Sequence, residues 1–424
     1  MTSPPAASPF AALGLSAALA RSAAAQGYDA PTPIQAAAIP PALQGRDLIA
    51  CAHTGSGKTA AFGLALLQRL AAPAAAAGAR AGRRPTRALV LVPTRELAAQ
   101  VGDTLRTLGH PLTPALKIAA VFGGVSINPQ MLALRGGADV LVATPGRLLD
   151  LVGHNAVQLD GLELLVLDEA DRLLDEGFAD ELARLTALLP AARQSLFFSA
   201  TFPAPVQALA AALLHEPVHL DVATAPQVAA PEITQRAMEV DPARRTALLR
   251  QLIAQEGWPR VLVFVATRYA SEHVAEKLRR AGLAAAAFHG DLSQGARQRV
   301  LAELNGGKLR VLLATDMAAR GLHIPELPVV VNYDLPRSAV DYTHRIGRTA
   351  RAGASGLALS FVSAATEAHF RLIEKRQGQR VPRERIEGFE PLETAPPASP
   401  PEGGIKGRRK SRKDKLREAA AREV

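Results

Sequence analysis

Residues 52–59 of the chain read Ala-His-Thr-Gly-Ser-Gly-Lys-Thr and follow the apolar run Asp47–Cys51. A glycine loop between a strand and a helix exposes backbone N–H groups, and the helix N-terminus adds a dipole that favours phosphate. In this pattern Lys58 reaches the β- and γ-phosphates and the Thr59 hydroxyl contacts Mg²⁺. Ala52 replaces the first glycine of the strict pattern, so the loop alone leaves a phosphate-like turn as the alternative. The residues expected to bind the nucleotide here are Thr54, Gly55, Ser56, Gly57, Lys58 and Thr59.

An acidic turn follows a second apolar run, Leu164–Leu167, and reads Asp168-Glu169-Ala170-Asp171. A carboxylate at the C-terminal tip of a parallel strand lies where α/β sheets bind their ligands. We expect Asp168 to hold Mg²⁺, directly or through water, and Glu169 to orient and deprotonate an attacking water. A solvated acidic turn is the alternative interpretation, and the phosphate loop upstream argues against it.

Short β-rich apolar runs alternate with longer helix-like segments from about residue 45 onward. This alternation predicts parallel sheets with helices on both faces. The uncharged, proline-containing stretch 223–231 interrupts it and is typical of a linker. We therefore predict two α/β domains, residues 1–222 and 232–385, with a cleft between them. The other predicted strands are Arg87–Pro93, Asp139–Ala143, Leu162–Leu167, Ser195–Phe198, Arg260–Val265, Leu309–Ala314, Pro328–Asn332 and Gly356–Val362.

Composition narrows the class of protein. The chain has 424 residues, 48% of them hydrophobic, and a formal net charge of +10. Its one cysteine, Cys51, cannot form an internal disulfide, and no Cys/His cluster has zinc-ligand spacing. No uncharged apolar run reaches about 18 residues, and no signal-peptide core precedes the first basic residue, Arg21. A secreted disulfide scaffold, a membrane protein and a wholly disordered chain are excluded, and the cytoplasm is the expected compartment.

The positive charge is concentrated near the C-terminus. Residues 402–424 contain nine Lys and Arg against four Asp and Glu, which is half of the net charge, and a proline-rich run precedes them. We predict a disordered basic tail over residues 386–424 that tethers nucleic acid, with a solubilising tail as the alternative.

Further motifs stand in a fixed order along residues 8–385, and with them the chain resembles a DEAD-box RNA helicase, most like the bacterial RhlE-type branch. The resemblance implies two tandem RecA-like domains, ATP and Mg²⁺ as cofactors, RNA as the partner and a monomer. It also implies RNA-stimulated ATP hydrolysis and separation of short RNA duplexes by local strand bending. The motifs, besides the two above, are Gly27–Gln35, Pro93–Leu97, Gly123-Gly124, Thr144–Arg147, Ser199–Thr201, Phe264–Arg268, His289–Arg297, Thr315–Gly321 and His344–Arg351.

Several nucleotide-site roles come from this resemblance. Gln35 would read the adenine edge because an amide donates and accepts at once, with Phe10 and Tyr28 packed around the base. Two arginines of the last motif would act as fingers on the γ-phosphate, and His344 would position the water. The two arginines are Arg348 and Arg351.

One position departs from the family pattern. The chain reads Arg320-Gly321-Leu322-His323 where family members have aspartate as the fourth residue. Gly321 and His323 would contact the nucleotide, and a protonated imidazole cannot accept the ribose hydrogen bond. We therefore expect weaker ATP-driven closure than with aspartate, and tighter ATP binding in the presence of RNA for His323→Asp.

The resemblance also implies an RNA surface that follows the sugar-phosphate backbone and is largely independent of sequence. In the second domain, too, the residues expected to contact RNA follow predicted strands. A coupling role, from nucleotide state to strand separation, falls on Ser199 and Thr201 through the turn that ends in Asp171. The RNA residues are Pro93, Thr94, Arg95, Gly123, Gly124, Thr144, Pro145, Gly146 and Arg147, then Thr267, Arg268, Gly290, Gln294, Arg297 and Thr315.

Two other classes of function remain open from the sequence. One is a DNA-directed helicase of the same architecture, since no residue by itself requires a 2′-hydroxyl group. The other is an RNA annealer or ribosome-assembly scaffold that works through the basic tail, although the intact Lys58, Asp168 and Glu169 argue against an inactive enzyme.

Overall fold

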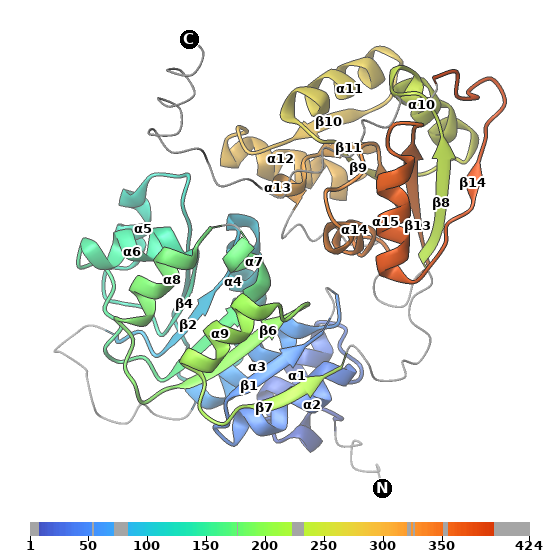
Figure 1. The fold of residues 1–424 in the computed structure, drawn as a ribbon. Coiled ribbons are helices and arrows are strands. Elements are labelled where there is room, and N and C mark those ends of the chain that lie inside the picture. The colour runs from blue at the N-terminus through green and yellow to red at the C-terminus, as the bar shows by residue number, and fades with distance from the viewer. Residues whose placement is uncertain are drawn as a thin grey trace, which may run out of the picture.

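The computed structural model consists of two lobes, the first coloured blue to green and the second yellow to red in Figure 1. The predicted linker 223–231 lies outside the described residues, as does the part of the predicted tail after Glu393. The described residues are 8–52, 55–71, 84–175, 177–222, 233–319, 324, 327–350 and 355–393.

The first lobe is built on a seven-stranded sheet in the order β3-β4-β2-β5-β6-β1-β7. All of its strand pairs are parallel; Cys51 stands opposite Ser199, and Asp168 opposite Phe198. The carboxyl ends of β5, β6 and β1 therefore lie side by side at one edge of the sheet. The strands are β1 Leu48–Cys51, β2 Ala88–Leu91, β3 Ile118–Val121, β4 Val140–Ala143, β5 Leu164–Asp168, β6 Gln194–Ser199 and β7 Val218–Asp221.

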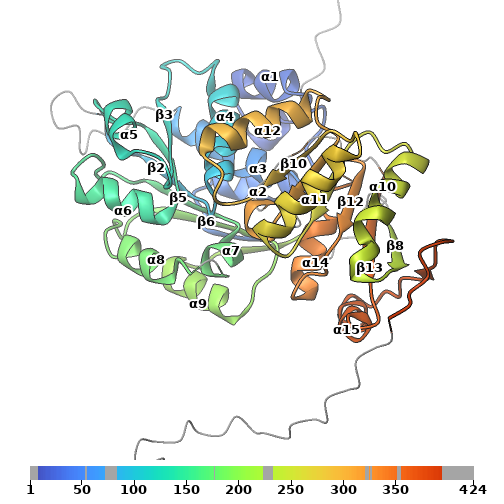
Figure 2. The ribbon, with the colours of Figure 1, turned by 90° about the horizontal axis from the view of Figure 1, so that it is seen from above.

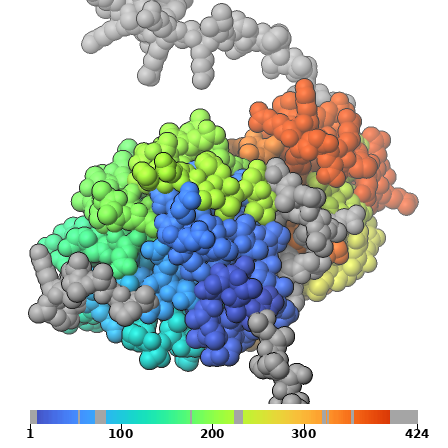
Figure 3. Space-filling model, turned by 90° about the horizontal axis from the view of Figure 1, so that it is seen from below, coloured from blue at the N-terminus to red at the C-terminus, as the bar shows by residue number. Residues whose placement is uncertain are grey.

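Helices cover both faces of this sheet because its strands are apolar on both sides. In β2, Ala88 and Val90 pack under α1 to α4, whereas Leu89 and Leu91 pack under α6 to α9 on the opposite face. Seen from below, the N-terminal helices form part of the surface of this lobe (Figure 3). The helices are η1 Ala11–Leu13, α1 Ala17–Ala25, α2 Pro33–Leu43, α3 Lys58–Leu70, α4 Arg95–Gly109, α5 Ile127–Ala133, α6 Pro145–Gly153, α7 Ala170–Asp175, α8 Ala179–Thr186 and α9 Ala204–Leu213.

The second lobe repeats the plan with a seven-stranded sheet in the order β10-β11-β9-β12-β13-β8-β14. Its strand pairs are also parallel. One face packs against α10 and α11, and the other against α12 to α15. The strands are β8 Ile233–Glu239, β9 Val261–Phe264, β10 Ala285–Phe288, β11 Val311–Ala314, β12 Val329–Asn332, β13 Gly356–Val362 and β14 Arg383–Glu384. The helices are η2 Pro242–Arg244, α10 Arg245–Gln255, α11 Arg268–Arg280, α12 Gln294–Asn305, α13 Asp316–Ala319, α14 Ala339–Ile346 and α15 Glu367–Gln377.

The predicted fold class, two tandem domains with parallel sheets covered by helices, is confirmed. Each of the nine predicted strands forms within about two residues of its expected ends. The five strands that the sequence did not predict are β3, β7, β8, β10 and β14. They are rich in alanine, partly exposed or very short, and these features weaken the apolar signal.

Beyond residue 385, the predicted end of the second domain, the chain continues to pack on the second lobe as far as Glu393. The Asp241 carboxylate accepts backbone N–H bonds from Leu392 (2.8 Å) and Glu393 (3.3 Å). The Phe389 ring lies under the Arg244 guanidinium, 5.1 Å away, and packs against the core below it. An apolar anchor and a carboxylate that satisfies two backbone donors keep this segment against the sheet.

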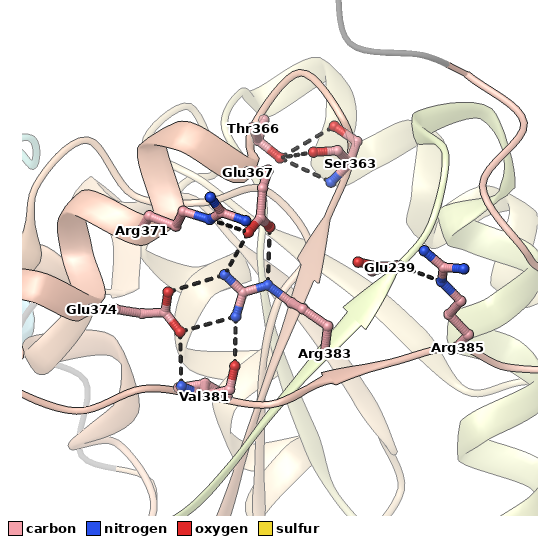
Figure 4. A network of polar contacts seen from close by, with 9 residues as sticks. All are labelled: Glu239, Ser363, Thr366, Glu367, Arg371, Glu374, Val381, Arg383 and Arg385. Atoms are coloured by element: carbon pink, nitrogen blue, oxygen red, sulfur yellow. Dashed lines mark hydrogen bonds and ion pairs between the residues drawn. The ribbon is translucent and has the colours of Figure 1, made fainter.

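One arginine, Arg383, joins the strand β14 to α15 (Figure 4). Arg383 forms ion pairs of 2.9 Å with both Glu367 and Glu374, and donates to the backbone carbonyl of Val381. Its guanidinium also lies 4.7 Å from the Phe370 ring. The last strand is therefore joined to α15 by buried, charge-assisted bonds.

Candidate functional site

The phosphate loop connects β1 to α3 at the carboxyl edge of the first sheet. Gly57 has φ +95°, and a Cβ atom there would lie 2.6 Å from Gln35 Nε2, so only glycine fits without a shift. Lys58 Nζ donates to the Ala52 carbonyl (2.9 Å), and the side chain is buried. Gly55, Ser56 and Thr59 are at least partly exposed, so the loop presents an open N-terminus of α3. Thr54 lies outside the described residues.

Gln35 supports the phosphate loop from behind. Its Oε1 accepts from Thr32 N (2.9 Å) and its Nε2 donates to the Gly57 carbonyl (3.2 Å), while the side chain is 2% exposed. Phe10 is fully buried in the core of the lobe, and Tyr28 is half-buried against the same core. The structure thus brings Gln35 to the loop, and it places Phe10 beneath the surface.

The two carboxylates of the acidic turn differ sharply in environment. Asp168 ends β5, is 3% exposed, and accepts from the Glu169 N–H (3.0 Å). Burial raises the pKa of Asp168 to about 7, although the charge of Lys58 acts to lower it. Glu169 takes φ +53°, a conformation that costs energy for a residue with a side chain and that is common at functional sites.

These residues fit a magnesium ion. Asp168 is a buried carboxylate whose pKa burial raises and the charge of Lys58 lowers, and Thr59 lies in the first turn of the neighbouring helix α3. Among the described residues no group of three or more His, Cys, Asp or Glu could hold a metal ion. Mg²⁺ commonly takes one or two carboxylates together with phosphate oxygens and water, so this donor set matches a nucleotide-bound ion.

The Ser-Ala-Thr segment after β6 is hydrogen-bonded to the acidic turn. Thr201 Oγ1 and N both donate to Asp171 Oδ2, at 2.7 and 3.1 Å. Ser199 Oγ accepts from Asp171 N (3.2 Å) and donates to the Thr201 carbonyl (2.8 Å). Three hydrogen bonds therefore join the Ser-Ala-Thr segment to the acidic turn.

The candidate RNA residues of the first lobe follow β2, β3 and β4, which form the other half of the same sheet edge. The Arg95 guanidinium lies so close to Gly124 that a Cβ atom there would meet Nη1 at 2.0 Å. Thr144 Oγ1 accepts from Gly123 N (3.4 Å). The candidate nucleotide-binding residues and the candidate RNA-binding residues therefore lie on adjacent halves of the carboxyl edge of the first sheet.

Arg147, in the first turn of α6, has hydrogen-bonding capacity left for a ligand. Its Nη2 donates to the Val125 carbonyl (2.7 Å), and its Nε lies 3.7 Å from the Asp150 carboxylate. Within the described part of the chain, Nε and Nη1 are buried and make no hydrogen bond. Buried donors normally have partners, so this arginine fits a phosphate oxygen. Pro145 and Gly146 begin α6 just before it. Pro93 lies in the turn between β2 and α4, and Thr94 caps α4 through its hydroxyl (3.2 Å to Leu97 N).

The second lobe arranges its candidate RNA residues in the same way, after the adjacent strands β9, β10 and β11. Thr267 caps α11, Arg268 pairs with Asp291, and both are exposed. Gly290 is exposed, Thr315 directly follows β11, and Gln294 Oε1 is buried without a hydrogen bond in the described chain.

Arg297 does not lie on this open surface, in contrast to expectation. Its side chain is 3% exposed, and its Nε lies 2.8 Å from Glu96 of the first lobe, an ion pair whose angle is not that of a hydrogen bond. The guanidinium also stacks over the Phe288 ring at 4.6 Å. Figure 2 shows α12 above α4, where this pair joins the lobes. Arg297 is therefore an interlobe contact.

Arg348, just after α14, lies close enough to the Glu169 carboxylate of the first lobe to be affected by its charge. It is 7% exposed; burial lowers its pKa, while Glu169 raises it and Arg172 lowers it. His344 lines the same small cavity between the lobes, and its Nδ1 is buried without a hydrogen-bond partner in the described chain. The structure thus brings one predicted finger to the acidic turn. Arg351, Gly321 and His323 lie outside the described residues.

The sequence did not single out two residues of this cavity, Arg172 and Asp341. Arg172 directly follows the acidic turn and contacts Asp341 of the other lobe at 3.7 Å. The position of Arg172 next to the acidic turn could have drawn attention to it, but its partner depends on how the lobes meet.

Among the described residues, the helices are too short or too polar to span a lipid bilayer.

Comparison with known proteins agrees with this geometry. Residues 32–209 match the DEAD/DEAH box helicase family, and residues 244–353 match the helicase conserved C-terminal domain. The DEAD-box ATP-dependent RNA helicase CshA of Bacillus cereus is 38% identical over 374 residues, which cover 88% of this chain and 69% of that protein. The ATP-dependent RNA helicase DeaD of Mycobacterium tuberculosis is 39% identical, over 87% of this chain and 63% of its own length.

Solved structures show the same arrangement. S. cerevisiae Dbp5 bound to RNA and ADP BeF3 superposes with a TM-score of 0.75 at 31% identity, covering 90% of this chain and 96% of Dbp5. Mss116p bound to ssRNA and AMP-PNP gives a TM-score of 0.77 at 25% identity, covering 89% of this chain and 78% of that one. With its two family matches and these relatives, the chain belongs to the DEAD-box ATP-dependent RNA helicases.

Proposed function

We propose that ATP binds to the first lobe, that RNA binds across both lobes, and that only the closed arrangement holds a complete catalytic set. The observation that carries this proposal is the position of Arg348, whose guanidinium is close enough to Glu169 of the other lobe to be affected by its charge. Because half of the catalytic set belongs to each lobe, RNA that holds the lobes together would stimulate hydrolysis.

Each proposed catalytic residue has one role. Lys58 contacts the β- and γ-phosphates, Glu169 accepts a proton from the attacking water, and His344 helps to position that water. Arg348 and Arg351 stabilise the charge that develops on the γ-phosphate. Thr59 and Asp168 would hold Mg²⁺, which neutralises phosphate charge.

The RNA strand would follow the paired half-edges of the two sheets. The donors there are backbone N–H groups, glycines and arginines, so the contacts address the sugar-phosphate backbone and are largely independent of sequence. A strand that must bend to contact both lobes departs from A-form geometry, and a short duplex that cannot follow loses base pairs. Ser199 and Thr201 would couple this step to the nucleotide through Asp171.

The decisive test is the ATPase rate of the full chain with and without single-stranded RNA, with a DNA strand of the same sequence in parallel. We expect stimulation by RNA and little by DNA. Equal stimulation by DNA would favour the DNA-directed motor. Strand annealing without any nucleotide hydrolysis would favour the annealer or scaffold.

Finer assignments remain predictions. They are the RhlE-type branch, the monomeric state, the cytoplasmic location and the domain division 1–222, linker 223–231 and a second domain from residue 232. For the end of the second domain we propose Glu393 instead of residue 385, and the contact of Glu393 with Asp241 supports this.

A further inference from the structure

The two lobes meet at a second ion pair, on the ATP side of the cleft. Arg172 Nη1 lies 3.7 Å from Asp341 Oδ1, with the arginine side chain 8% exposed and the aspartate 26%. Asp341 is held in place by Ser338, whose Oγ donates to Oδ2 at 2.7 Å. The other carboxylate oxygen is thereby directed to Arg172.

The elements at this pair are those that carry the proposed catalysis. Arg172 is the first residue after Asp168–Asp171 and belongs to α7, and Asp341 lies in the first turn of α14. The same helix carries His344, and Arg348 follows it; all four side chains line one small cavity. A contact that fixes α14 against α7 therefore also sets how far Arg348 reaches toward Glu169.

Charge balance gives the pair a second effect. Arg172 and Arg348 are both cationic and close enough that Arg172 lowers the pKa of Arg348. Asp341 lies against Arg172, and the neighbouring Asp316 is already paired with Arg345 at 2.6 Å. Without Asp341, closing the cleft would bring two arginines together in a poorly hydrated site, where like charges repel strongly.

We propose that Arg172 and Asp341 form an interlobe latch that positions Arg348 beside the γ-phosphate, with Asp341 also neutralising the cation that would otherwise repel this arginine. Both are positioning residues for the hydrolysis proposed above, on which this inference rests. The latch makes a specific prediction: the variant that lacks both charges should hydrolyse ATP with RNA better than the variant that lacks only the aspartate.

The experiment compares Asp341→Asn, Arg172→Gln, Arg172→Lys and the double variant Arg172→Gln/Asp341→Asn in the full chain. For each we measure the RNA-stimulated kcat, the RNA concentration for half-maximal ATPase, and the ATP Kd without RNA. Asparagine keeps the shape of the side chain and can still accept from Ser338. Controls are Glu276→Gln and Arg106→Gln, which break exposed ion pairs within single helices.

Asp341→Asn should raise the half-maximal RNA concentration or lower kcat by about tenfold, whereas the ATP Kd without RNA stays the same because ATP binds one lobe. Arg172→Gln should change these two quantities less than Asp341→Asn does, and Arg172→Lys should keep them within about threefold of the wild type. The double variant should have values within about threefold of those of Arg172→Gln. An unaltered Asp341→Asn, or a double variant whose loss equals the product of the two single losses, would overturn the latch.

A second readout separates the latch from the proposed function. Small-angle scattering with AMP-PNP and single-stranded RNA reports closure without turnover, and Asp341→Asn should have a larger radius of gyration than the wild type. If the wild type shows no RNA-stimulated ATPase, the proposed function fails. In that case equal radii for the two proteins still refute the latch, and a larger radius for the variant supports it.

Discussion

At the scale of single residues, Glu169 is the side chain whose replacement should separate binding from hydrolysis. Glutamine has the same size and keeps the strained turn at φ +53°, but it cannot accept the proton of the attacking water. We expect Glu169→Gln to bind ATP and RNA with affinities close to wild type and to lose at least about 100-fold in RNA-stimulated kcat. Single-turnover hydrolysis and equilibrium RNA binding measure the two effects; an unaltered kcat would show that Glu169 is not the base.

Asp168 gives a prediction about pH in the nucleotide-free, metal-free protein. Because burial raises its pKa to about 7, the folded state binds this proton more tightly than the unfolded state does, and the resulting stability is complete below about pH 4 and lost as pH rises through about 7. Asp168→Asn cannot ionise, so it should not lose stability as pH rises. We expect the variant to melt at least about 3 °C above wild type at pH 8 and to show little difference at pH 4.5, in EDTA. The same difference in Tm at both pH values would contradict the buried-acid account.

At the scale of elements, the sequence predicted the strands with continuous apolar runs and missed those that are rich in alanine, partly exposed or very short. β2 and β12 are continuous apolar runs with full burial, so their signal needs no context. β10 reads Ala-Ala-Ala-Phe, and β7 alternates between half-buried and exposed positions. Both become strands because a neighbouring strand offers its hydrogen bonds, which is information from the tertiary structure. The phosphate loop and the acidic turn were predictable because their spacing along the chain sets their geometry.

The strand β14 is held by ion pairs rather than by an apolar run: Glu384 pairs with Arg236 of β8, and Arg383 pairs with α15. Arg383 is 15% exposed and bridges Glu367 and Glu374, whereas the nearby Arg385 is 69% exposed and forms one pair with Glu239 (Figure 4). Removing Arg383 leaves Glu374 without its cation and Glu367 with Arg371 alone, so we expect Arg383→Ala to lower Tm by several degrees, on the order of 2 kcal/mol. Arg385→Ala is the matched control and should change Tm by less than about 1 °C. Equal effects of the two variants would mean that the buried network does not hold the strand.

At the scale of the whole molecule, the two sheets follow the same plan. The candidate RNA residues follow the first three strands of each sheet order, which are β3, β4 and β2 in the first lobe and β10, β11 and β9 in the second. The interlobe partners of Arg297 and Arg172 could not be predicted from the sequence. Each contacts a residue of the other lobe, Glu96 or Asp341, and a partner more than a hundred residues away on a separate domain has no local sequence signal. The motifs predict the candidate site residues within each lobe, whereas the ion pairs between the lobes depend on how the two lobes are arranged.

The basic C-terminal residues give the last prediction at this scale. The described chain follows the second lobe to Glu393 along the β8–β14 side of its sheet, whereas the candidate RNA residues follow β9, β10 and β11 on the other side. Residues 394–424 carry nine basic and four acidic side chains. If they bind RNA, they do so by phosphate contacts added to those of the lobes, and such contacts release counterions.

Truncation after Glu393 should therefore weaken RNA binding mainly at low salt and make the plot of log K against log salt less steep, by about 0.7 for each phosphate of a single strand that the tail no longer neutralises. The RNA-stimulated kcat at saturating RNA should stay unaltered, because the catalytic set lies in the two lobes. A full-length variant with these lysines and arginines changed to glutamine is the matched control and should behave like the truncation. An unaltered salt slope in both proteins would show that the tail is not a tether and would favour its role in solubility.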